Sequence, residues 1–126
     1  MSRLRTVLVV AAGLVLIASS AAHSLLGWPQ MLVRLTAEHA SLDLISGLAM
    51  GWHFGGVAML TLGLLALWLA SVAQRSIDVR APVGLIGVAY IAFGAGAAAA
   101  LGFDVFQIVF LAPGVLLTAA ALMPDR

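Results

Sequence analysis

The stretch LAMGWHFGGVAMLTLGLLALWLA, residues 48–70, decides the fold because its 23 residues include no Asp, Glu, Lys or Arg. A helix needs about 20 predominantly apolar residues to cross the hydrocarbon core of a bilayer. Lipid cannot hydrogen-bond to the backbone, so a spanning segment must be a helix or a strand of a closed barrel. The stretch lacks the two-residue alternation of barrel strands, and it therefore predicts a transmembrane helix.

Three further apolar runs flank this segment, at residues 7–26, 82–101 and 105–123. Together the four runs predict an all-α fold, a bundle of four transmembrane helices with antiparallel neighbours and a single integral membrane domain over residues 1–126. The composition agrees, because 63% of the residues are hydrophobic and only 9% are charged, too few to cover a soluble domain. A net charge of +1 leaves no basic face for nucleic acid, and the absence of cysteine excludes disulfides and thiolate chemistry.

The first run also has the features of a secretory signal peptide. Arg3 and Arg5 precede its apolar core, and small residues occupy positions 19–22, where a peptidase would cleave. We expect the run to remain in place as an uncleaved first span.

The arginines predict the orientation, because loops that stay in the cytoplasm carry an excess of positive charge. Five of the six share one side of the predicted membrane: Arg3, Arg5, Arg75, Arg80 and Arg126. Only Arg34 lies on the other side, so we expect both termini in the cytoplasm. The absence of lysine and the abundance of Ala, Arg and Leu are compatible with a GC-rich bacterial genome, and the predicted location is a bacterial inner membrane.

The outer side is predicted to hold one long and one short connection. In the loop 27–47, the Trp28-Pro29 step predicts a bend and then a short interfacial helix. A continuous helix from residue 41 to 73 would be about 50 Å long, so it either projects from the membrane or breaks, with Gly47 and Gly51 as predicted points of a break or of close approach by another helix. Between spans three and four, Gly102 as a helix end and Asp104 as an N-cap predict a tight hairpin.

Ionisable residues gather on this outer side and supply the candidate site. His23 and His53 are expected at similar depth on adjacent antiparallel helices, where their rings would be able to meet. Imidazole binds transition metals and haem iron, and an ionisable group inside a membrane is a functional hypothesis by default. Helix capping or interhelical hydrogen bonds, a metal or haem site, and proton or substrate chemistry are the alternatives for this pair.

Three more outer residues are candidates for catalysis, namely His39, Asp43 and Asp104. His39 and Asp43 are four residues apart, so they share a face if that stretch is helical, and the carboxylate would then orient the imidazole. The same spacing also occurs on solvated helices. No paired carboxylates, lysines or run of polar groups cross the predicted midplane, which disfavours pumps, channels and secondary transporters.

Small residues predict where helices pack. Gly47, Gly51 and Gly55 recur every four residues, and Gly94 and Gly96 belong to an alanine-rich face of span three. Such stripes suit close contact with another helix, and a flat cofactor is the alternative occupant. Because so small a bundle exposes most of its perimeter, we expect it to form homo-oligomers or to join a larger membrane complex.

Two short motifs carry a resemblance to a known group. With Leu26-Gly-Trp-Pro29 at the end of span one and Leu62-Gly63-Leu64-Leu65 in span two, the chain resembles the DoxX-like group of small four-helix bacterial membrane proteins. The likeness covers the topology and nearly the whole length. The group usually carries a carboxylate in span two, where this chain has His53 as its ionisable residue. The resemblance implies association with larger membrane or redox complexes.

Three functional hypotheses follow from the sequence. The favoured one is a non-enzymatic accessory or structural subunit of a membrane assembly. The second is an outward-facing redox or small-molecule enzyme that uses His23 and His53 around a metal, haem or lipid-soluble substrate. The third is a binder of a hydrophobic small molecule such as a quinone, a carotenoid or a lipid.

Overall fold

A computed structural model describes residues 2–73 and 77–124, and these residues form helices and short connections without any strand. In chain order the elements are α1 (Arg3–Ala22), the π-helical turn η1 (His23–Gly27), α2 (Trp28–Ala37), α3 (Leu42–Val72), α4 (Arg80–Leu101), the 3-10 turn η3 (Val105–Gln107) and α5 (Ile108–Leu122). Four helical segments are long and apolar enough to cross a membrane, which confirms the all-α four-helix prediction. Arg75 and Arg126, used above to predict the orientation, lie outside the described residues.

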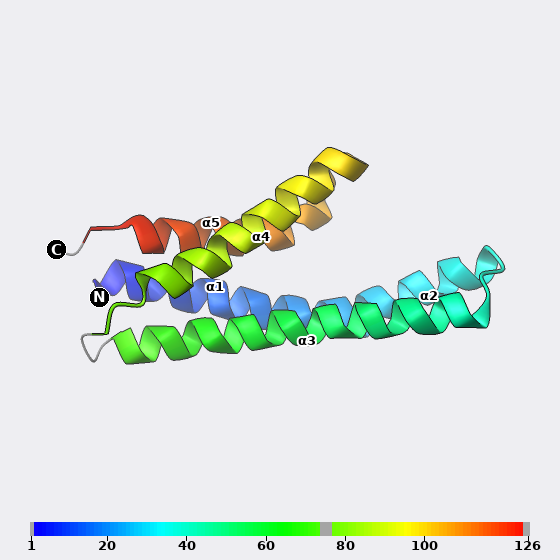
Figure 1. Ribbon diagram of the computed structural model, residues 1–126, viewed down its shortest axis with the longest axis horizontal. Helices are drawn as coiled ribbons and strands as arrows, with labels where there is room; N and C mark the ends of the chain where they lie inside the picture. The colour runs from blue at the N-terminus through cyan, green and yellow to red at the C-terminus, as the bar shows by residue number, and fades with distance from the viewer. Residues whose placement is uncertain (1, 74–76, 125–126) are drawn as a thin grey trace.

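The helices pair into two hairpins of unequal length (Figure 1). The first consists of α1, η1 and α2 as one run of 35 residues and of α3 with 31 residues, which correspond to about 52 and 46 Å of helix. The second consists of α4, with 22 residues, and of η3 with α5, with 18 residues. A bilayer core is about 30 Å thick, so the first hairpin projects beyond the second at the end opposite the chain termini (Figure 1).

The outer segment is more helical than the sequence predicted. The expected loop over 27–47 is reduced to residues 38–41, and α3 passes through Gly47 and Gly51 as one helix, so of the two alternatives it projects rather than breaks. At Trp28-Pro29 the chain continues as a helix through the π-turn, in which the Trp28 N–H bonds to the His23 carbonyl oxygen. Pro29 explains this turn, because its ring would clash with the carbonyl four residues earlier in a regular α-helix. A wider turn removes the clash without ending the helix.

Each hairpin is closed by a reciprocal contact between two glycines. A Cβ atom built on Gly63 of α3 would lie 2.9 Å from the Gly13 carbonyl oxygen of α1, and one built on Gly13 would lie 3.1 Å from the Gly63 oxygen. In the second hairpin, a Cβ atom on Gly87 would lie 2.9 Å from the Gly114 oxygen, and the reverse distance is 3.0 Å. Only glycine permits backbones to approach so closely, so these four positions set the helix spacing within each hairpin.

The two hairpins meet at the end that carries the termini. Arg5 is buried, and its guanidinium donates to the Met123 carbonyl oxygen just after α5. At the start of α4, the Asp78 carboxylate accepts the Arg80 N–H at 3.0 Å and lies 3.3 Å from the Arg80 Nε. These hydrogen bonds lower the pKa of Asp78. The pair is exposed, so it adds little stability.

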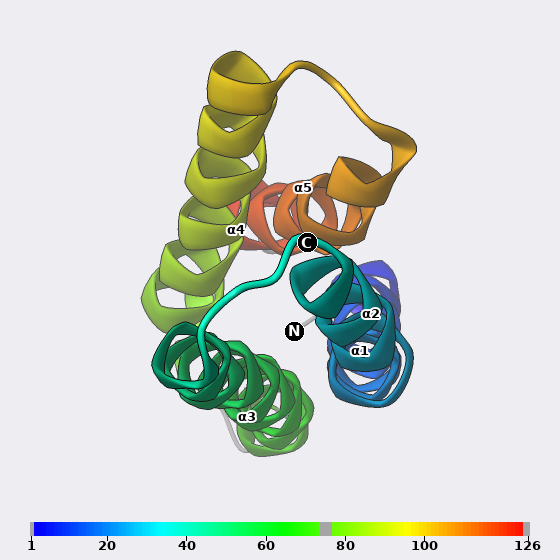
Figure 2. The ribbon, with the colours of Figure 1, turned by 90° about the vertical axis from the view of Figure 1, so that its right-hand side faces the viewer.

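The hydrophobic core fills only the half of the bundle near this end. The completely buried side chains there include Val9, Ala12, Leu16, Ala66, Leu117 and Ala120. Met59 and Tyr90 lie at the outer edge of the core, and no hydrophobic side chain of residues 21–58 is buried. Beyond this level α4 leans away from α3 (Figures 1 and 2). The bundle is therefore closed near the termini and open at the opposite end.

We expect the Gly63→Ala variant to be less stable than the wild type by about 1–3 kcal/mol, because the new methyl group would push α1 away from α3. Gly47→Ala is the matched control, since a Cβ atom there meets nothing within 4 Å. Unfolding of the detergent-solubilised proteins with SDS, followed by circular dichroism, measures both. Equal stability of the two variants would contradict the role given to the Gly13–Gly63 contact.

Candidate functional site

The candidate site is centred on an exchange of hydrogen bonds between His23 and Trp52. The Trp52 Nε1–H donates to the His23 carbonyl oxygen at 2.7 Å, and the His23 Nε2 lies 3.0 Å from the Trp52 carbonyl oxygen, to which it donates. The two rings are stacked, with centroids 4.4 Å apart and planes 5° from parallel. The two residues thus join η1 to α3 through both their backbones and their rings.

Small residues allow the two helices to approach closely enough for this exchange. A Cβ atom on Gly27 would lie 2.9 Å from the Trp52 ring, and one on Gly56 would clash with the Ser24 hydroxyl oxygen. The Ser20 hydroxyl donates to the Gly56 carbonyl oxygen at 2.7 Å and is buried. Contacts between α1 and α3 therefore continue outward from the glycine pair to the level of Trp52, which fixes the position of the His23 ring.

The hydrogen bond from the His23 Nε2 to the Trp52 carbonyl oxygen also determines which ring atom His23 offers to a ligand. A neutral imidazole whose Nε2 carries the hydrogen keeps Nδ1 as an acceptor. The ring is half-buried and lines two separate cavities. His23 is therefore held in one orientation by the protein and still has a face directed toward open space.

The two cavities lie where the hairpins diverge. One, of about 300 Å³, is bordered by α1 and α5, and the other, of about 260 Å³, by α3 and α4. Both are lined by His23, Met59 and Phe110, and we call the pair the wedge. Its remaining lining is almost entirely apolar: Val15, Ala18, Ser19, Ala22, Phe106, Val109, Gly55, Ala58, Ala89, Tyr90 and Phe93.

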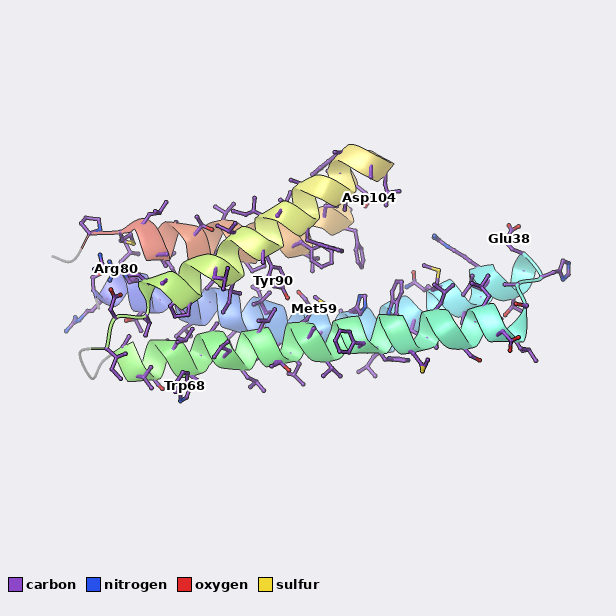
Figure 3. The ribbon with its side chains drawn as sticks, in the orientation of Figure 1. Glu38, Met59, Trp68, Arg80, Tyr90 and Asp104 are labelled. Carbon is purple, nitrogen blue, oxygen red and sulfur yellow. The ribbon has the colours of Figure 1, made fainter. Side chains whose placement is uncertain are left out.

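Tyr90 brings a second polar atom to the wedge. Its side chain points from α4 toward the first hairpin, and Met59 lies in the facing part of α3 (Figure 3). The Tyr90 ring lies 6.2 Å from that of Phe110, which in turn meets Phe93 edge to face at 4.8 Å. No hydrogen bond joins the Tyr90 hydroxyl to any residue in the described part of the chain. The hydroxyl is available to a ligand.

The other candidate residues predicted from the sequence do not converge on His23. The His53 side chain is exposed, and its ring lies 5.7 Å from that of Trp28. Each of the two histidines predicted to meet therefore has an indole as its ring partner. Within residues 2–73 and 77–124, no three His, Asp or Glu side chains are grouped so that they could hold one metal ion.

His39 lies in the turn between α2 and α3 and Asp43 in the first turn of α3, so the condition for their sharing a helix face is not met. His39 has a φ of 54°, and the Ala40 N–H bonds to the Leu35 oxygen at 2.9 Å, which ends α2. Ser41 then caps α3 by accepting the Leu44 N–H at 3.3 Å. Both candidate residues are exposed.

Asp104 acts as the predicted N-cap and accepts the Phe106 N–H at 2.9 Å. Its own N–H donates to the Gln107 side-chain oxygen at 2.7 Å, and the Gln107 amide donates to the Gly102 oxygen at 3.0 Å. Gly102 has a φ of 82°, as expected for a helix end. The tight connection between α4 and α5 is confirmed, and Gln107 is a structural residue that the sequence did not single out.

The predicted packing glycines have different surroundings. A Cβ atom on Gly94 would lie 2.9 Å from Leu111 of α5, and one on Gly55 would lie 3.4 Å from the His23 ring. At Gly47, Gly51 and Gly96 it would meet nothing within 4 Å. These three positions face open space in the single chain, so their role in contacts with a partner stays a prediction.

Comparison with known proteins adds no further assignment. No family model, curated protein or solved structure matches this chain. The resemblance to the DoxX-like group therefore stays a prediction.

The Trp52→Phe variant tests the exchange between Trp52 and His23. The ring stack can persist, but the loss of the Nε1–H should lower the free energy of unfolding by about 0.6–1.7 kcal/mol, as for other interhelical hydrogen bonds in membranes. Trp68→Phe is the control, because Trp68 lies exposed near the other end of α3 (Figure 3). SDS titration of both variants gives the comparison, and a larger loss for Trp68→Phe would contradict the assignment.

Proposed function

We propose that this multi-pass membrane protein binds a lipid-soluble small molecule in the wedge without transforming it chemically. The observation that carries the proposal is that the two hairpins, each held together by its glycine contact, separate from one another beyond Met59 and Tyr90, on the side away from the chain termini. Protein interiors are close-packed, so a space of this kind inside a bilayer favours an apolar occupant. Its lining suits a hydrocarbon chain or a flat ring system such as that of a quinone or carotenoid.

The few polar groups of the wedge support recognition rather than catalysis. Small-molecule sites are mostly apolar, with a small number of polar groups that orient the ligand. The His23 Nδ1 and the Tyr90 hydroxyl have this role in the proposal. Metal or acid–base chemistry usually needs further ligands or a charged partner, whereas the lining of the wedge, among the described residues, contains no carboxylate and no histidine besides His23.

We further propose a bacterial inner membrane as the location, with both termini in the cytoplasm. Among the described arginines, Arg3, Arg5 and Arg80 belong to the end that carries the termini, and Arg34 belongs to the opposite end (Figures 1 and 3). The excess of positive charge at the first end supports this orientation.

A second candidate function is the non-enzymatic accessory subunit favoured by the sequence. It is supported by the outer part of α3, where Leu42, Met50 and Phe54 have exposed fractions of 81%, 74% and 74%. Gly47 and Gly51 lie in open space in the same part of the helix. Exposed apolar and small residues together suit contact with a second copy or another membrane protein.

The two functions make different predictions. For the accessory subunit, Gly51→Leu should insert normally and yet migrate as a smaller species on native gels, because the added side chain would block a helix contact. Unchanged migration of this variant would contradict the accessory role, and it has no bearing on the wedge.

For the binding function, the test is to fill the wedge from either side with Ala18→Phe and Ala89→Phe. Ala92→Phe is the control, since Ala92 is exposed on α4 and lines neither cavity. After purification in mild detergent and organic extraction, mass spectrometry should find a lipid-soluble molecule retained by the wild type and by Ala92→Phe. The filled variants should lose about 90% of it, a tenfold change that corresponds to about 1.4 kcal/mol.

The binding function would be contradicted by equal retention in all four proteins, because the retained molecule would then lie outside the wedge. A wild-type protein that retains no such molecule would contradict it as well.

A further inference from the structure

A third cavity continues the wedge toward the projecting end of the first hairpin. It has a volume of about 410 Å³, lies between α2 and the start of η3, and shares Ala22 and Phe106 with the cavity between α1 and α5. Unlike the wedge, it has charged side chains in its lining, namely Arg34 and Asp104, together with the amide of Gln30. We call this third cavity the mouth.

The two charges of the mouth belong to different hairpins. Arg34 is on α2, and Asp104 precedes η3 at the far end of the second hairpin (Figure 3). Both side chains are exposed, and no ion pair between them is found in the described part of the chain. Asp104 uses only its Oδ1 oxygen to cap η3. Because Asp104 also lines the mouth, its carboxylate keeps an oxygen and its negative charge for a ligand there. An apolar wedge thus leads into a site with one positive and one negative group.

We propose that the wedge and the mouth together hold one phospholipid whose headgroup carries a phosphate and a primary ammonium group, as phosphatidylethanolamine does. The lipid belongs to the leaflet at the end opposite the chain termini. Its phosphate binds the Arg34 guanidinium, its ammonium group donates to the Asp104 carboxylate, and one acyl chain lies in the cavity between α1 and α5. The inference rests on the proposed function, because it names the class of molecule that occupies the wedge.

The dimensions of the site fit such a lipid. The lining residues on the continuous run of α1, η1 and α2 extend from Val15 to Arg34, which is about 28 Å of helix at 1.5 Å per residue. One leaflet with its headgroups is about 20–22 Å thick, half of a whole bilayer. The lining is therefore long enough for an acyl chain and a headgroup in line, with the charged residues at the correct end.

The chemistry of the two charges selects the headgroup. A guanidinium offers several N–H donors that match phosphate oxygens, and a charge-assisted hydrogen bond to a carboxylate needs a donor on the cation. A primary ammonium has three such N–H groups, whereas the quaternary ammonium of phosphatidylcholine has none. Phosphatidylglycerol has no cation for Asp104. The site should therefore distinguish three headgroups that share the same acyl chains.

The test is native mass spectrometry of the full chain in mild detergent, titrated with the three phospholipids carrying identical acyl chains. The wild type should retain phosphatidylethanolamine at least about threefold better than either of the others, given the stronger charge-assisted bonds. Asp104→Asn keeps the N-cap, because Asn can also accept the Phe106 N–H, and it should abolish this preference. Arg34→Gln should lower the retention of all three lipids, since all three contain a phosphate.

Two charge-matched variants serve as controls, because each removes the same charge outside the mouth. Arg3→Gln lies at the opposite end of the bundle, and Glu38→Gln lies in the turn after α2. Both should behave as the wild type. Equal retention of the three lipids by the wild type would overturn the inference, as would effects of Arg34→Gln and Asp104→Asn no larger than those of the controls.

Ala18→Phe separates a failure of this inference from a failure of the proposed function. If this variant loses lipid while the two mouth variants behave as the wild type, the headgroup assignment is overturned and the wedge remains the binding site. If Ala18→Phe retains every lipid as well as the wild type does, both the inference and the proposed function are overturned.

Discussion

The close approach of two backbones at Gly13 and Gly63, repeated at Gly87 and Gly114, is the constraint on which the rest of the structure depends. In a bilayer, helix association cannot rely on the hydrophobic effect, because lipid is as apolar as the helix surface. Contact through glycines supplies van der Waals packing within each hairpin without a large side-chain core. Each hairpin is therefore held together by its own contacts. The two hairpins need to share a side-chain core only over part of their length.

That partial core explains the position of the candidate site. Near the termini the hairpins pack through side chains such as Leu16 and Leu117, both completely buried. Farther from the termini, His23 of η1 and Trp52 of α3 each form a hydrogen bond to the other's carbonyl oxygen, and α4 separates from both elements. The wedge therefore forms between the first hairpin, whose helices stay paired at this level, and the second hairpin, which leans away from it. Its polar groups come from both hairpins, since His23 lies in η1 and Tyr90 in α4.

The sequence predicted the helices well because the apolar runs leave little choice in a membrane, and it predicted the Gly102 and Asp104 hairpin from local capping chemistry. It failed at Trp28-Pro29, where a π-turn preserves a helix that local propensity would end. It left open whether the helix through Gly47 and Gly51 projects or breaks, and in the structure this helix is continuous and projects. The glycine spacing did not identify Gly13, Gly63, Gly87 and Gly114 as the contacts within the chain, since periodicity cannot tell an open face from a packed one. His23 was found from its depth, but its partner Trp52 required the relative rotation of two helices, which one sequence does not contain.

Distance measurement by double electron–electron resonance in lipid nanodiscs tests the central claim most directly, and the absence of native cysteine allows labels to be placed without other changes. One pair of labels at Trp68 and Leu85 reports on the end near the termini, and another at Met50 and Leu101 reports on the opposite end, all four positions being exposed. The separation of the hairpins predicts a clearly longer distance for the pair at Met50 and Leu101. Equal distances for the two pairs would mean that α3 and α4 stay together along their length, which would contradict the open wedge.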